Sequence, residues 1–222
     1  MFFKLLLGVW MSAVIVAAFL FLPAAKGFAE PETARIVVFH VPNAMIAVVA
    51  FVMAMAYGIA YLRTGDLRND AKSSVAAELG LVFAALATVT GAFFAQRQWG
   101  SWWVPNDVRE TSIVVLLLIY MAYFALRQAV ESPEKRASLS AVYAILAVLP
   151  MLFLTFVLPR MVYSLHPANT LSTKHGLSTD YRIVLGAAML GFTGLFVWLF
   201  RIKTALSEFR LNAERSKRRI GK

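Results

Sequence analysis

Cysteine is absent from the 222 residues, and charged residues make up only 15% of them. The lack of cysteine excludes disulfides, thiolate metal sites, iron–sulfur clusters and thiol redox chemistry within this chain. Any metal must therefore be held by histidine, methionine or oxygen ligands. The shortage of charge, together with 60% hydrophobic residues, argues against a water-soluble globule and indicates a membrane protein.

Six apolar runs approach or exceed the length of about 20 residues that a helix needs to cross a bilayer. The segments between them are too short for a separate soluble domain, so we expect one polytopic membrane domain over 1–222. The predicted fold class is an all-α bundle of six transmembrane helices, and Pro150 should loosen or kink the fifth of them. The predicted spans are about 5–25, 37–62, 78–95, 111–127, 139–159 and 182–201.

The first run has a second interpretation as a cleaved signal peptide, because small residues follow it at Leu22-Pro23-Ala24-Ala25. Its apolar stretch is longer than the usual signal core of about 7–15 residues, which favours a retained helix. Apart from residues near their ends, the spans contain almost no ionisable side chain; the one acidic residue within them is Glu78, close to the start of the third. Ion-coupled carriers need such groups at depth, so this class is disfavoured.

Positive charge is distributed unevenly across the predicted topology. If Met1 is cytoplasmic, Lys4, the two loops on that side and the segment from Arg201 onward carry 15 of the 22 Lys and Arg. The positive-inside rule then predicts a bacterial inner-membrane protein with both termini in the cytoplasm. We therefore explain the formal charge of +10 by membrane topology and not by nucleic-acid binding. The basic tail at 202–222 is expected to lie against anionic lipid.

The outer loops collect the residues that can bind a ligand. Three tryptophans, Trp99, Trp102 and Trp103, lie within five residues in the predicted outer loop 96–110. Such density favours a platform for a flat ring over a simple interfacial belt. Asp107 and Glu110 form a predicted capping box for the fourth span. The flanking Arg97 and Arg109 indicate anionic partners, either carboxylates or lipid phosphates.

Two histidines are expected at the same membrane face. His40 precedes Pro42 at the outer end of the second span, which places it at or just before a helix start. His166 follows the fifth span, and His175, nine residues later, is the rival for its role. Two neutral imidazoles are what six-coordinate haem iron requires, with the porphyrin stacked on aromatic rings.

The tryptophan loop resembles a signature of the CcmC branch of haem-handling membrane proteins, WGxWWxWD. Trp99-Gly100-Ser101-Trp102-Trp103 matches its opening, and Arg109 with Thr111-Ser112 matches its continuation. The usual Trp-Asp is replaced by Pro105-Asn106-Asp107, so either Asn106 or Asp107 fills the position of the motif acid. The segments around His40 and His166 resemble those in which the family carries its axial ligands.

The resemblance implies a role in cytochrome c maturation. Such a protein would hold haem b non-covalently and transiently through His40 and His166 as iron ligands, with Trp99, Gly100, Trp102, Trp103, Asp107, Arg97 and Arg109 around it. It would present the haem at the periplasmic face to a haem chaperone of the CcmE type. Further implied partners are ABC-transporter subunits of the CcmA and CcmB type and a small CcmD-like subunit.

Two other functions remain open from the sequence. One is a cytochrome c synthase of the same superfamily, acting as a haem lyase subunit, although this chain has little room for the extra spans or large outer domain of such proteins. The other is a non-haem scaffold or carrier in which the tryptophans only anchor the protein at the interface. Haem delivery is favoured, and a stand-alone enzyme is not expected.

Overall fold

The computed structural model describes residues 2–25, 28–166 and 176–220, all of whose regular structure is helical. Its elements are α1 (Phe2–Leu20), the 3-10 helix η1 (Pro31–Ile36), α2 (Val37–Thr64), α3 (Leu67–Trp99), α4 (Val108–Ala129), α5 (Pro133–Leu152), the π-helix η2 (Phe153–Val157), α6 (Leu158–Met161) and α7 (Thr179–Ile220). Six helices are long and apolar enough to cross a membrane, with α5, η2 and α6 forming one of them. The predicted six-span, all-helical bundle is therefore confirmed.

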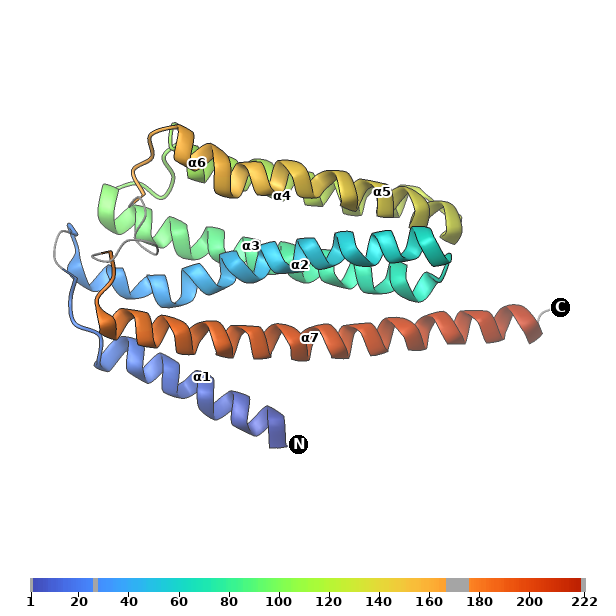
Figure 1. Cartoon of the computed structure of the whole chain (residues 1–222), viewed down its shortest axis with the longest axis horizontal. Coiled ribbons are helices and arrows are strands. Elements are labelled where there is room, and N and C mark those ends of the chain that lie inside the picture. The colour runs from blue at the N-terminus through green and yellow to red at the C-terminus, as the bar shows by residue number, and fades with distance from the viewer. Residues whose placement is uncertain (1, 26–27, 167–175, 221–222) are drawn as a thin grey trace.

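The α2–α3 hairpin forms the middle layer of the bundle (Figure 1). The α4–α5–α6 arm lies on one side of it, while α7 lies on the other side, between it and most of α1. Tight turns between the helices follow from local chemistry: Gly65 ends α2 in the left-handed conformation at φ 67°, and the Asp66 carboxylate caps α3 by accepting from the Arg68 N–H.

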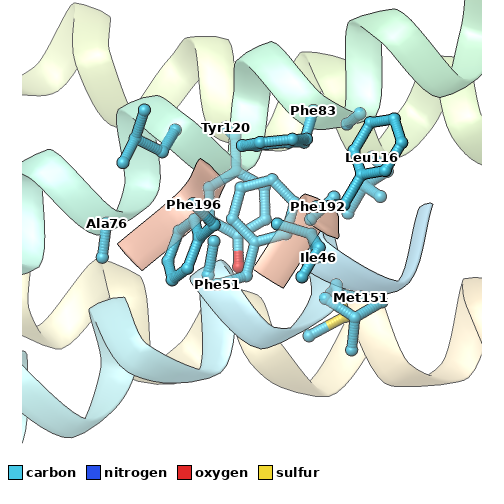
Figure 2. Packing of buried hydrophobic residues seen from close by; sticks show 14 of the residues in the cluster. Ile46, Phe51, Ala76, Phe83, Leu116, Tyr120, Met151, Phe192 and Phe196 are labelled. Carbon is cyan, nitrogen blue, oxygen red and sulfur yellow. The ribbon is translucent and has the colours of Figure 1, made fainter. Parts of the chain in front are cut away.

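Aromatic packing joins the middle layer to both neighbours. The rings of Phe51 in α2 and Tyr120 in α4 stack with centroids 3.5 Å apart, and Phe83 in α3 meets Phe196 in α7 edge to face (Figure 2). Phe51 reaches this position because Gly80 leaves room: a Cβ on that glycine would lie 2.6 Å from the Phe51 ring. Side chains facing away from the bundle are mostly large and apolar, as lipid contact requires.

Several helices extend beyond the predicted spans. α3 begins eleven residues before Glu78, so this carboxylate lies inside the helix, where it pairs with Lys203 of α7. α7 continues through the predicted tail as far as Ile220. At 1.5 Å per residue its 42 residues measure about 63 Å, roughly twice the hydrocarbon thickness. Its C-terminal part therefore projects past the bundle (Figure 1).

Two helix starts differ in detail from expectation. α2 begins at Val37, directly after η1, so His40 lies inside its first turn and Pro42 in its interior rather than at its start. The expected break near Pro150 takes the form of the π-helix η2, which begins three residues later and is followed by Pro159 in α6. Extra backbone per turn at this point widens the fifth span near its C-terminal end.

Candidate functional site

A cavity of about 600 Å³ lies at the end of the bundle where the loops after α1, α3 and α6 meet. This volume is in the range of about 300–1,000 Å³ typical of small-molecule sites. Both predicted histidines contribute to its wall, although 126 residues separate them in the chain. Most of the remaining wall is apolar or aromatic, including Phe28, Met45, Phe94, Phe156, Pro159 and Tyr181.

His40 reaches the cavity from the first turn of α2. Its Nδ1 lies 3.0 Å from the Ala87 carbonyl oxygen and 3.1 Å from the Thr90 hydroxyl of α3. Because the carbonyl can only accept, Nδ1 carries the proton and Nε2 keeps its lone pair. Gly91 permits this arrangement, since a Cβ there would lie 3.2 Å from Cε1 of the imidazole. The ring is therefore held in one tautomer with a free ligand nitrogen.

His166 is fixed in the same manner by a carboxylate. Its Nδ1 lies 3.2 Å from Oδ1 of Asp107 and 3.3 Å from the Ser164 hydroxyl. The Trp99 indole meets the imidazole edge to face, with ring centroids 5.0 Å apart. A histidine whose Nδ1–H bonds a carboxylate presents Nε2 as a metal ligand with raised basicity. In both imidazoles Nδ1 thus has a protein acceptor of the kind that usually orients a metal-binding histidine.

Asp107 connects the tryptophan loop to the segment that carries His166. Its side chain is fully buried, and Oδ1 caps α4 by accepting from the Arg109 and Glu110 N–H groups. Oδ2 accepts from the Ser164 hydroxyl at 2.8 Å and the Leu165 N–H at 2.7 Å. Asn106 is exposed. The carboxylate that contacts the candidate ligand is therefore that of Asp107.

The predicted capping box is half correct. Asp107 caps the helix as expected, but the Glu110 carboxylate accepts from the Val104 N–H and not from the Asp107 N–H. The Asp107 N–H donates to the Val104 carbonyl instead, at 2.9 Å. Both acidic residues therefore fold the loop back on the first turn of α4, which gives the loop a fixed shape.

The titration of these two groups follows from their surroundings. Burial lowers the pKa of His166 to about 4, outweighing the Asp107 carboxylate, which raises it; the charges of Arg109 and His40 lower it further. Burial acts to raise the pKa of Asp107, but the hydrogen bonds from Ser164 and Leu165 prevail and the pKa is lowered. At neutral pH a neutral imidazole therefore faces an ionised carboxylate.

An acid titration tests this arrangement in the ligand-free protein. We expect His166 to titrate near pH 4 rather than near its ordinary value of about 6.5. Between about pH 6.5 and pH 4 the folded form binds fewer protons than the unfolded form. The packing of 162–166 should therefore weaken as pH falls through this range, and it should stay constant above about pH 6.5. Histidine NMR in micelles, assigned with His166→Gln, measures the midpoint. A midpoint near 6.5 would show that the ring is not buried.

The three tryptophans occupy different positions, and none is among the described residues that line the cavity. Trp99 packs between His166 and Phe94, whose ring lies on the cavity wall. Trp102 is 54% exposed and rests on Phe93. Trp103 is half-buried, with its backbone bonded to the Ser101 hydroxyl. The aromatic surface inside the cavity is made chiefly by phenylalanine.

Gly100 has a structural reason to be glycine. It ends α3 in the left-handed conformation at φ 74°, and its N–H donates to the Gln96 carbonyl. A residue with a side chain is strained in this conformation. The glycine thus sets the direction in which the tryptophan loop leaves α3.

Among the cations, Arg109 lines the cavity and Arg97 does not. The Nε of Arg109 is buried and lacks a hydrogen-bond partner within the described ranges. Arg97 is 61% exposed and pairs with Glu30 at 3.6 Å. Arg160, which sequence reasoning missed, is a second cavity cation. Its place at the C-terminal end of the fifth span was the available signal, because an arginine at that depth needs an anionic partner.

The loop between α1 and α2 closes another side of the cavity and is tied down by side chains. The Gln98 amide of α3 accepts from the Ala29 N–H at 2.9 Å and donates to the Glu30 carbonyl at 3.0 Å. The Tyr181 hydroxyl of α7 donates to the Pro23 carbonyl, also at 3.0 Å.

Since 26–27 and 167–175 are outside the described residues, the predicted rival His175 is not placed.

Comparison with known proteins shows to which family the chain is related. The model of one family, CcmC, Heme exporter protein C, matches residues 2–219. The Heme exporter protein C of Paracoccus denitrificans is 32% identical over 186 residues, which cover 80% of this chain and 77% of the relative. That of Rhodobacter capsulatus is 30% identical over 210 residues, covering 93% and 86%. That of Haemophilus influenzae is 26% identical over 222 residues, covering 96% and 86%.

The family match extends over nearly the whole chain. The six candidate membrane spans agree with a multi-pass membrane protein. Three relatives from different organisms carry the same description, and each alignment includes most of both proteins. We conclude that this chain belongs to the Heme exporter protein C (CcmC) family of cytochrome c maturation.

Proposed function

We propose that the chain binds haem in the 600 Å³ cavity, with His40 and His166 as the two axial iron ligands. The observation that carries this proposal is that both imidazoles line one cavity while each Nδ1 is held by a protein acceptor. The two Nε2 atoms are then the nitrogens available to iron. Haem is the cargo of this site, held non-covalently and transiently.

The remaining cavity wall suits the other parts of a haem molecule. Phenylalanine rings and aliphatic side chains would contact the porphyrin, whose faces are apolar. Arg109, whose Nε has no partner among the residues that the structure describes, and Arg160 would pair with the propionate carboxylates. Trp99 would act on the porphyrin indirectly, by supporting the His166 ring. Direct contact of Trp102 or Trp103 with haem remains a prediction from the sequence.

The charge distribution supports the direction of delivery. The cavity end of the bundle carries few of the Lys and Arg residues, so the positive-inside rule favours a periplasmic location for this end and a cytoplasmic one for both termini. A haem bound there would be accessible to a periplasmic chaperone of the CcmE type. ABC-transporter subunits of the CcmA and CcmB type and a CcmD-like subunit are the further partners that family membership suggests.

Visible spectra of the purified full-length chain test the ligand assignment. The wild type should retain haem with the Soret and visible bands of bis-histidine iron. His40→Ala and His166→Ala should each retain at least about ten-fold less, because one axial bond and its oriented imidazole are lost. Added imidazole should restore part of the band by entering the space left by the ring.

His175→Ala is the matched control, since it removes the third histidine of the chain. It should keep the wild-type spectrum. Loss of the band in this variant but not in His166→Ala would transfer the second ligand to His175. Unchanged spectra in both His40→Ala and His166→Ala, with folding verified by gel filtration, would contradict the proposed site.

A further inference from the structure

A second cavity of about 360 Å³ lies at the opposite end of the bundle from the histidines. It is bounded by the beginning of α3, the α4–α5 turn and the C-terminal half of α7. Unlike the first, its wall is strongly charged: it combines four cations with two carboxylates. These six residues are Asp70, Glu78, Arg127, Arg136, Lys203 and Arg210.

Two of the four cations are neutralised inside the wall. Arg127 bonds Asp70 through both terminal nitrogens, at 2.6 and 2.9 Å, and both side chains are nearly buried. Lys203 pairs with Glu78. These contacts use both carboxylates of the wall. The cavity therefore keeps a net charge of about +2 from the other two cations.

Those cations are Arg136 and Arg210. No ion pair or side-chain hydrogen bond joins either of them to another described residue, and the Nε of Arg136 is buried without a partner. A buried guanidinium nitrogen without an acceptor costs free energy comparable to a lost hydrogen bond. An anion in this cavity would relieve that cost. Guanidinium groups bind phosphate oxygens in pairs, which makes a phosphate ester the best match.

The position of the cavity indicates the source of the phosphate. Arg127 lies in the last turn of α4 and Arg136 in the first turn of α5, the depth at which lipid headgroups lie. Apolar side chains share the wall, and Leu206 continues into an exposed apolar stripe of α7 with Ile202 and Phe209. A headgroup in the cavity could leave its acyl chains along this stripe.

We infer that this cavity binds the phosphate group of an anionic phospholipid between α3, α5 and α7, with Arg136 and Arg210 as its main partners. The site is separate from the proposed haem site and does not depend on it. A bound lipid would hold the α4–α5 turn against α7 at the boundary of the membrane.

Native mass spectrometry of the full chain in detergent tests the inference with phosphatidylglycerol and phosphatidylcholine of identical acyl chains. We expect the wild type to retain phosphatidylglycerol in clear preference. Arg136→Gln with Arg210→Gln should weaken that retention about ten-fold, because two charged hydrogen-bonding groups are removed. Arg63→Gln with Arg68→Gln is the matched control. It removes two exposed charges from the same end of the bundle, outside the cavity, and should change retention less than two-fold.

Three outcomes would overturn the inference. Equal retention of the two lipids would remove the preference for anionic headgroups. Equal losses in the two double variants would assign binding to general surface charge. Displacement of the lipid by millimolar glycerol phosphate would identify a soluble phosphate ester as the ligand. Should the double variant not fold, Arg136→Lys keeps the charge but loses the paired geometry, and it should retain less lipid than both the wild type and the Arg63→Gln with Arg68→Gln control.

Discussion

Replacing Asp107 with alanine is expected to remove haem binding and to destabilise the end of the bundle that carries the two histidines. The carboxylate caps α4, bonds Ser164 and Leu165, and lies against the His166 Nδ1. Loss of the cap and of buried hydrogen bonds should cost about 3 kcal/mol. Haem retention should fall about 10–100-fold, the usual effect of removing a partner that orients a metal ligand.

Asp107→Asn separates the two roles of this side chain. Asparagine is a good N-cap, so the start of α4 should be preserved and most of the stability retained. The negative charge beside His166 is lost, so haem retention should still decrease. Asn106→Ala is the matched control, because the Asn106 side chain is next to Asp107 in the sequence but is exposed. Thermal unfolding and haem absorbance measure the two effects. Normal haem retention in Asp107→Ala would show that this carboxylate does not contribute to haem binding.

Breaking the buried ion pair at the other end should have a comparable effect on stability and little effect on haem. Arg127→Ala would leave the Asp70 carboxylate buried without its cation, which costs roughly 3–5 kcal/mol. The arginine also lies 5.7 Å from the Tyr123 ring centre, so packing is lost with the charge. Thermal unfolding in detergent should show a large decrease in Tm.

A double replacement distinguishes the effect of losing the ion pair from the effect of losing side-chain volume. Asp70→Leu with Arg127→Met removes both charges and keeps apolar bulk, so much of the stability should return. Haem absorbance per folded molecule should stay at the wild-type level in all these variants, because the pair lies far from the histidine cavity. A double variant as unstable as Arg127→Ala would argue that neither charge burial nor pairing causes the loss.

The fold was largely predictable because bilayer crossing imposes strong rules on composition. Apolar runs of about the required length predicted all six spans. Helix ends were less predictable. α3 and α7 continue into polar sequence because pairs such as Glu78 with Lys203 stabilise the helices beyond the hydrocarbon core.

The candidate site was predictable in its residue types and only partly in its arrangement. His40, His166 and Arg109 were selected from the sequence, and the structure brings all three to one cavity. Arg97, selected for the same reason as Arg109, points to Glu30 instead. Linear spacing cannot distinguish two arginines twelve residues apart when a loop reverses the chain between them.

The sequence by itself determined that this is a six-helix membrane protein without thiol chemistry, and that its ligand-type side chains gather at one end. Only the tertiary structure decided that His40 meets Ala87 while His166 meets Asp107, contacts that set the tautomer of each ring. It also decided that phenylalanine lines the cavity while the tryptophans stay outside its wall. The physical reason is that apolar periodicity and capping act over a few residues, whereas a cavity depends on how distant helices pack.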